Sequence, residues 1–151
     1  MFELIALSAL MTLLCVCLHS GGLLLLFFWL ERSMPNLFER MGFLRNSILL
    51  LQVFAVILTL HLVEIGLWAV LYSRQSFFGD FETALYYSFS AYTTVGYGDL
   101  VLPAGWRLVG SLETCVGFLL FGWSTAYFWA VSSRILTERH QQHTAAVQGR
   151  K

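Results

Sequence analysis

Three long apolar stretches limit what this chain can fold into. They run from Leu4 to Leu30, from Ser47 to Tyr72 and from Trp106 to Ser133. A helix needs about 20 apolar residues to cross the hydrocarbon core of a bilayer, and each stretch is long enough. Only 12% of the 151 residues are charged, whereas about a quarter of a soluble domain is charged. The sequence therefore predicts an all-α membrane protein with three transmembrane helices.

The first stretch differs from a secretory signal peptide. No basic residue precedes it, its apolar run is too long, and no small-residue cleavage site follows it. We therefore expect residues 1–30 to remain as a transmembrane helix.

A shorter apolar segment, FETALYYSFSAYT, occupies residues 81–93 and is only about half a membrane long. Asp80 is suited to cap the start of a helix, and Glu82 places negative charge in its first turn. The sequence Gly-Tyr-Gly follows almost at once. This order predicts a re-entrant segment, which enters the membrane partway as a helix and returns as extended chain.

Basic residues predict the orientation, because they favour cytoplasmic loops. Those in the linker 31–45 and the tail 134–151 are Arg32, Arg40, Arg45, Arg134, Arg139, Arg150 and Lys151. Only Arg74 and Arg107 fall on the opposite side. We expect the linker and the tail to be cytoplasmic, and the N-terminus and the re-entrant segment to lie outside.

The linker 31–45 has a periodicity of its own. Met34, Leu37, Phe38 and Met41 recur at i, i+3, i+4 and i+7. Both an amphipathic helix on the inner leaflet and a plain linker are consistent with this pattern. The polar tail is too short for a ligand-binding domain, and no span carries the regularly spaced arginines of a voltage sensor.

The sequence TTVGYGD, residues 93–99, is the most informative segment. Non-helical backbone is tolerated at membrane depth only where protein buries it or water lines it. A strand whose carbonyls all point one way needs dihedrals of alternating handedness, and glycine reaches the left-handed region without penalty. Gly96 and Gly98 stand two apart, so Val95 and Tyr97 are expected to point away from the carbonyls, into protein. Four such strands predict stacked rings of oxygens that replace the water shell of an alkali cation.

The pentapeptide TVGYG, residues 94–98, resembles the selectivity-filter signature of potassium channels. The longer sequence ALYYSFSAYTTVGYGDL is similar to their pore helix and filter, and GWRLVGSLETCVGFLLFGWST is similar to their inner helix. With the second apolar stretch as outer helix, the resemblance covers residues 46–133. It implies a two-helix pore domain with pore helix 81–93 and inner helix 106–133, to which residues 1–30 add an extra transmembrane helix.

The resemblance implies a passive, potassium-selective channel. One chain supplies one filter strand, so a homotetramer is expected. Backbone carbonyls, with one threonine hydroxyl, are expected to coordinate K⁺ at Thr94, Val95, Gly96 and Tyr97, and Gly98 completes the filter. Residues expected to support the filter are Asp99, Tyr86, Tyr87, Ser90 and Thr93. Residues expected to line the cavity or gate are Gly117, Phe118, Phe121, Gly122 and Thr125.

Two features depart from the simplest pores of that family. The extra helix 1–30 is expected to lie at the periphery, where its patch Ser20-Gly21-Gly22 allows a close approach to a neighbouring helix. Ser90 stands where some relatives carry a glutamate behind the filter, so the support of Asp99 is expected to differ.

Two carboxylates, Glu64 and Glu113, lie inside predicted spans, each about two to three turns from the outer boundary. Charge is costly there, so we expect a buried polar cluster of Glu64, Glu113 and His61, with Ser88 or Ser90 as further partners. It either couples pH to conduction or only joins the helices. A metal site made by His61 and the two carboxylates is a third interpretation.

Cys15 and His19 share a helical face one turn apart, but two possible ligands alone do not define a metal site.

Other functions are less compatible with the sequence. It contains no nucleophile–base pair and no phosphate-binding loop, so catalysis is not expected. The net charge of +0 points to no nucleic-acid partner. No cofactor other than permeant K⁺, and no soluble partner, is expected. A non-conducting subunit of a channel assembly and a weakly selective cation channel remain alternatives, although the complete Gly-Tyr-Gly argues against both. The absence of eukaryotic targeting features fits a bacterial inner membrane.

Overall fold

The computed structural model describes residues 2–38 and 43–148. Its elements are the helices α1 (Phe2–Phe38), α2 (Phe43–Arg74), α3 (Phe81–Tyr92) and α4 (Arg107–Gln148), with the 3-10 turn η1 (Ala104–Trp106) before α4. The described residues contain no β-strand, and α1, α2 and α4 are long and apolar enough to cross a membrane. The predicted all-α class with three membrane-spanning helices is confirmed.

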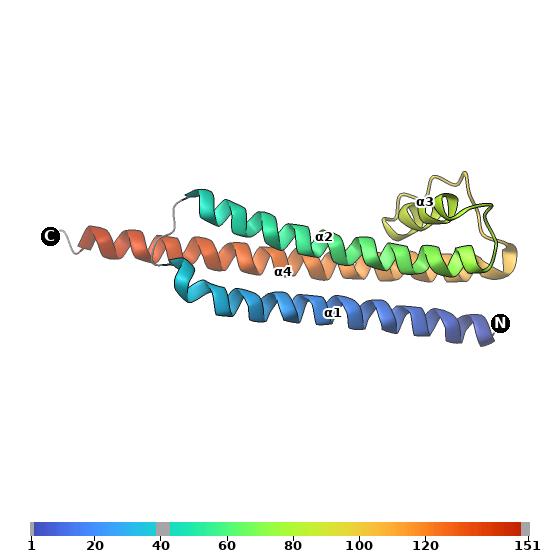
Figure 1. Cartoon of the computed structure of the whole chain (residues 1–151), viewed down its shortest axis with the longest axis horizontal. Helices are drawn as coiled ribbons and strands as arrows, with labels where there is room; N and C mark the ends of the chain where they lie inside the picture. The colour runs from blue at the N-terminus through green and yellow to red at the C-terminus, as the bar shows by residue number, and fades with distance from the viewer. Residues whose placement is uncertain (1, 39–42, 149–151) are drawn as a thin grey trace.

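The three long helices lie side by side in an elongated bundle (Figure 1). α1 packs against both α2 and α4, and α3 packs against α2 and α4. The short α3 lies at the end of the bundle that also holds the N-terminus, and the C-terminus lies at the opposite end. The short helix α3 and the start of α1 therefore share one end of the molecule.

The small residues of α1 bring it close to α2 at one position. A Cβ atom added to Gly22 would lie 2.5 Å from Leu60 Cδ2, whereas one added to Gly21 would meet nothing within 4 Å. The close approach expected of this patch therefore occurs at Gly22, and its partner is α2 of the same chain.

Two apolar clusters fill the bundle, one toward each end. The cluster near α3 includes Cys15, Ile65, Trp68, Tyr72, Tyr92, Leu102 and Val109. The other cluster consists of Leu23, Leu26, Leu30, Leu49, Val53, Ile57 and Ile135. Between them, along both α1 and α2, lie buried polar residues. Lipid tails are as apolar as leucine, so packing and interhelical hydrogen bonds are what distinguish this arrangement from separated helices.

α3 begins and ends close to where the sequence predicts. Asp80 caps it, and the backbone N–H of Thr83 donates to Asp80 Oδ1 at 2.7 Å. This hydrogen bond favours the ionised form and holds the pKa of Asp80 below its ordinary value. The helix ends at Tyr92, and Thr93 is its C-cap.

The linker 31–45 and the tail 134–151 both contain more helix than the sequence predicts. α1 continues to Phe38, into the linker 31–45, while residues 39–42, including Met41, lie outside the described part of the chain. The prediction that the linker lies on the inner leaflet stays a prediction. α4 does not stop near Ser133, because residues 134–148 contain no glycine or proline that would end a helix.

Candidate functional site

The backbone of the TTVGYGD segment alternates in handedness. The φ angles of Thr94, Gly96 and Gly98 are positive, at 64°, 56° and 80°, whereas those of the intervening Val95 and Tyr97 are not. The sequence predicts the two glycines at these positions. It does not predict Thr94, whose side chain makes the left-handed conformation costly by about 1–3 kcal/mol.

Backbone donors of this segment are tied to the end of α3. The N–H of Thr94 donates to Ala91 O at 3.0 Å, and the N–H of Gly96 donates to Ser90 O at 3.0 Å. The N–H of Tyr97 donates to the Ser90 hydroxyl at 3.2 Å. Within the described part of the chain, no carbonyl oxygen of residues 94–98 accepts a hydrogen bond. Three of the five N–H groups of residues 94–98 are therefore bound to α3, whereas the carbonyl oxygens are free.

Tyr86 and Ser90 hold the segment from behind. The hydroxyl of Tyr86 donates to Asp99 Oδ2 at 2.9 Å, and this bond raises the pKa of Tyr86. Its ring is nearly parallel to that of Tyr97, with the centroids 6.2 Å apart. Ser90, at the position where the resemblance predicts a different support network, contributes both its carbonyl and its hydroxyl.

The other two residues expected to support the segment contact residues outside it instead. The ring of Tyr87 lies 5.2 Å from those of both Tyr72 and Phe78, measured between centroids. The hydroxyl of Thr93 donates to Phe89 O at 2.6 Å, within α3. Tyr87 therefore packs in the apolar cluster, and the Thr93 side chain closes the end of its own helix.

Val95 and Tyr97 are not covered by their own chain. Val95 is 52% exposed and Tyr97 is 70% exposed. The expectation that these side chains point into protein is therefore not met within a single chain. Tyr97 stacks on Tyr86 on one side only, so most of its ring stays uncovered by the described residues.

A cavity of about 290 Å³ lies behind the segment. Its lining comes from α3, from the extended segment and from the first turns of α4, and includes Tyr86, Ser90, Gly98, Asp99, Arg107 and Thr114. The small side chain of Ser90 leaves this space, where a longer acidic side chain would fill part of it.

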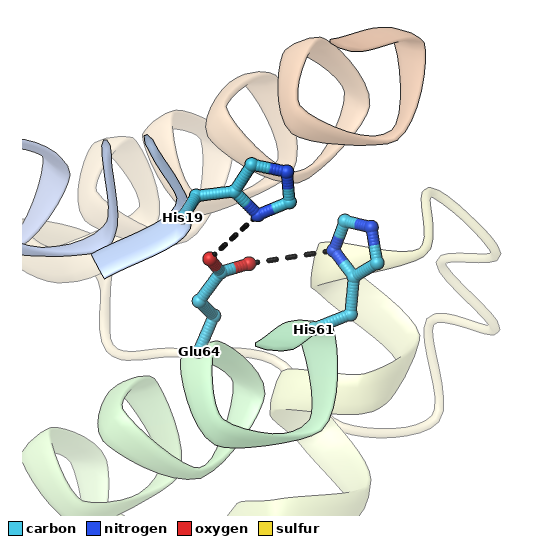
Figure 2. A group of neighbouring side chains, drawn as sticks. All are labelled: His19, His61 and Glu64. Atoms are coloured by element: carbon cyan, nitrogen blue, oxygen red, sulfur yellow. Dashed lines mark hydrogen bonds and ion pairs between the residues drawn. The ribbon is translucent and has the colours of Figure 1, made fainter. Parts of the chain in front are cut away.

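A ring of hydrogen bonds joins all four helices in the middle of the bundle. Nδ1 of His19 lies 2.9 Å from Glu64 Oε1, and Nε2 of His19 lies 2.9 Å from Ser124 Oγ. His61 contacts the same hydroxyl through Nε2, at 3.1 Å, and the Tyr92 hydroxyl through Nδ1, at 3.0 Å. Tyr92 donates to Glu64 Oε2 and closes the ring. Figure 2 shows both imidazoles directed at the one carboxylate.

The ring has five links, and each link needs one proton. The five side chains together carry five exchangeable protons when the group is neutral overall, whether as a carboxylate with an imidazolium or with every member uncharged. A neutral ring therefore satisfies every polar atom that it contains. Because the group is neutral overall, it can be buried without leaving an uncompensated charge inside the bundle.

The predicted buried cluster is divided in the structure. His61 and Glu64 lie together, as expected, but Glu113 contacts other residues. It accepts hydrogen bonds from Tyr72, at 2.7 Å, and from Ser88. The physical reason is that Glu113 faces α3 and the outer part of α2, whereas Glu64 also faces α1.

His19, Tyr92 and Ser124 complete the ring and were missed. Tyr92 and Ser124 carry no local pattern that distinguishes them from packing residues. His19 gave one signal, its place on the face of Cys15, but its partner lies 45 residues away.

A family model described as "Ion channel" matches residues 49–133, more than half of the chain. The chain belongs to this ion channel family. The match covers most of α2, all of α3, the TTVGYGD segment and α4 as far as Ser133. Comparisons with curated proteins and with solved structures gave no match. The protein is thus an integral membrane ion channel, and α1 lies outside the matched region.

The five residues of α4 that are expected to line the cavity or gate differ in their exposure. Phe118, Phe121, Gly122 and Thr125 are exposed, and their spacing places them on one face of α4. Gly117 is buried, and a Cβ atom added there would lie 2.2 Å from the carbonyl oxygen of Tyr92. Gly117 therefore lets the end of α3 approach α4 closely, whereas a Cβ at Gly122 would meet nothing within 4 Å.

Proposed function

We propose that this channel is selective for potassium and conducts K⁺ passively through a pore lined by the carbonyl oxygens of residues 94–97. The observation that supports this most strongly is the difference between the N–H groups and the carbonyl oxygens of the segment. The N–H groups of Thr94, Gly96 and Tyr97 are bound to α3, while the carbonyl oxygens of residues 94–98 accept no hydrogen bond within the described residues. Oxygens left free in this way are available to a cation.

Alternating handedness supports the same proposal. A backbone that alternates between left- and right-handed residues can direct successive carbonyls to one side, which a row of ion sites requires. Hard oxygen ligands suit an alkali cation, and rings of such carbonyls replace its hydration shell in potassium channels with the same pentapeptide.

A ring of oxygens needs more than one chain. Each chain contributes one TVGYG segment, and potassium filters are built from four. We therefore infer a homotetramer in which neighbouring chains cover Val95 and Tyr97, the two side chains that a single chain leaves exposed. The exposed face of α4 with Phe118, Phe121 and Thr125 then lines the cavity below the filter.

The helix α3 adds an electrostatic contribution. Its C-terminal end at Tyr92 carries about half a negative charge, and four such ends directed at the pore axis stabilise a cation there. With the basic linker and tail on the inner side, α3 and the filter face outward in a bacterial plasma membrane, and no voltage sensor is involved.

Purified protein in liposomes under opposed K⁺ and Na⁺ gradients tests the proposal. We expect a reversal potential close to the equilibrium potential of K⁺. A reversal potential near zero would identify a weakly selective cation channel. Absence of current from protein that is correctly inserted would identify a non-conducting subunit, and either result contradicts the proposal.

A further inference from the structure

Three buried side chains from α1 and α2 gather around one point in the bundle. The side-chain donor atoms of His19, His61 and Glu64 all lie within 4.8 Å of one another, and the residues are 0%, 3% and 0% exposed. We propose that these three residues bind a divalent transition-metal ion such as Zn²⁺. This site lies outside the proposed carbonyl-lined filter and takes a different ion.

The spacing of the donor atoms suits such an ion. His19 Nδ1 lies 2.9 Å from Glu64 Oε1, and His61 Nδ1 lies 3.3 Å from Glu64 Oε2. Zinc bonds to imidazole and carboxylate are about 2.0–2.1 Å long, so a tetrahedral site places its donors roughly 3.3 Å apart. These two pairs are already close to that separation, and the remaining pair of donor atoms, which lies within 4.8 Å, closes as the ion binds. Both imidazoles are directed at the carboxylate (Figure 2).

The outer nitrogens of both histidines have the arrangement that metal sites use. Nε2 of His19 and Nε2 of His61 lie 2.9 Å and 3.1 Å from the same oxygen, Ser124 Oγ. A metal-bound histidine usually donates its second ring N–H to an oxygen, which fixes the tautomer and the ring plane. In the ring His61 Nδ1 donates to Tyr92, which donates to Glu64. Once that proton is released and both Nε2 atoms donate to Ser124, both Nδ1 lone pairs face the carboxylate.

Ligand chemistry decides which ion fits. Two imidazoles with one carboxylate favour Zn²⁺ and its first-row neighbours, whereas K⁺ and Mg²⁺ prefer oxygen alone. The Tyr92 hydroxyl lies 3.0 Å from His61 Nδ1 and provides a further oxygen beside Glu64. The ion replaces a proton of the hydrogen-bonded ring, and the carboxylate offsets part of its charge.

A route to the site is present on one side of the bundle. A cavity of about 260 Å³ between α2 and α4 is lined in part by His61, Phe121, Ser124 and Thr125. An ion in this cavity meets two members of the ring directly. Once bound, it joins α1 to α2 and so fixes the helix outside the family match onto the channel domain.

Zinc binding to the full-length protein in detergent tests the inference. After removal of metal with a chelator, the protein is titrated with Zn²⁺ against a fluorescent competitor. We expect one ion per chain. His19→Asn and Glu64→Gln, which preserve much of the side-chain shape, are expected to lose this ion. The double variant His140→Asn/His143→Asn, which removes the other two histidines of the chain, is expected to keep it.

Two further measurements separate a metal site from other outcomes. Ser124→Ala is expected to weaken binding on the order of 10–100-fold, because it removes the oxygen that orients both imidazoles. Co²⁺ bound to the unmodified protein is expected to give a visible spectrum of nitrogen and oxygen ligation. A thiolate charge-transfer band would place the ion on cysteine and overturn the inference.

The inference is equally overturned if His19→Asn and Glu64→Gln bind like the unmodified protein, or if only the tail variant loses the ion. The Co²⁺ spectrum needs no variant, so the result stands even where a substitution prevents folding. Binding is measured without ion flux, and its failure therefore says nothing against potassium conduction.

Discussion

Single residues set the backbone of the TTVGYGD segment. Gly96 and Gly98 occupy left-handed conformations that the sequence predicts, and Thr94 adopts a third one that it does not. Glycines elsewhere in the chain have another role. At Gly117 the determining factor is space, since the carbonyl of Tyr92 lies where a side chain would be. The sequence shows each glycine but not which of these two reasons applies.

Gly96→Ala is expected to abolish potassium selectivity while leaving assembly intact. A Cβ at Gly96 meets nothing within 4 Å, so the substitution causes no clash. Alanine is instead disfavoured by the left-handed φ of 56°, by about 1–2 kcal/mol. The backbone is therefore expected to leave this conformation, and the carbonyls lose their alignment. Gly79→Ala is the control, because it is equally open and its φ is not left-handed. Reversal potentials in liposomes give the answer. Unchanged selectivity in Gly96→Ala would contradict the carbonyl-lined pore.

Gly117→Ala is expected to lower thermal stability in detergent, and Gly122→Ala is expected to leave it nearly unchanged. The added methyl at Gly117 overlaps the backbone of Tyr92, and overpacking of this kind costs about 1–3 kcal/mol. Unfolding temperatures of the two variants provide the comparison. Equal temperatures would show that the close approach of α3 to α4 does not require a glycine at position 117.

At the scale of elements, local patterns predicted the helices but not their partners. The limits of α3 follow from Asp80 and from the Gly-Tyr-Gly that comes after it, and the spans follow from hydropathy. The hydrogen bond between His19 and Glu64 joins residues 45 apart, and no local pattern encodes such a distance. Glu113 was grouped with Glu64 for the same reason, because similar depth does not reveal which helix a side chain faces.

Tyr92→Phe is expected to destabilise the bundle by about 1–3 kcal/mol, because it breaks the ring between His61 and Glu64. It leaves Glu64 Oε2 without its donor and the Nδ1–H of His61 without its acceptor. Tyr127→Phe is the matched control. The Tyr127 hydroxyl is buried and has no hydrogen-bond partner among the described residues, so its removal is expected to be neutral or stabilising. The measurement is the unfolding temperature of both variants. An equal decrease of this temperature in the two would show that the ring contributes no stability.

Asp80→Asn is expected to reduce the acid sensitivity of α3. The native pKa of Asp80 is lowered, so its capping bond contributes stability above its ordinary value, and this contribution is lost as pH falls through the lowered value. Asparagine caps a helix equally well without titrating. Unfolding temperatures between neutral pH and pH 3 are the measurement. Parallel curves for the two proteins would show that the cap does not titrate with folding.

At the scale of the whole molecule, the chain combines a recognised channel domain with a helix outside the family match. Residues 49–133 match the family, and α1 packs on both α2 and α4 of that region. The sequence predicts that α1 crosses the membrane at the periphery but not which helices it contacts, because three apolar helices pack together in several ways with similar hydropathy. Gly22 and His19 select the observed arrangement through contact with Leu60 and Glu64.

The detergent-solubilised protein is expected to have the mass of four chains. One segment with free carbonyls and uncovered Val95 and Tyr97 side chains is incomplete as a pore, and fourfold assembly completes it. Native mass spectrometry measures the stoichiometry directly. A dimer or trimer as the largest stable species would be incompatible with the proposed pore.

The unbroken course of α4 has a mechanical consequence. The helix contains 42 residues and is therefore roughly 63 Å long, about twice the thickness of the hydrocarbon core. A rod of that length conveys torsion from one end to the other. Turning of the conducting end, beside Gly117, would thus be reproduced at Gln148, where an attached spectroscopic label can report it far from the ions themselves.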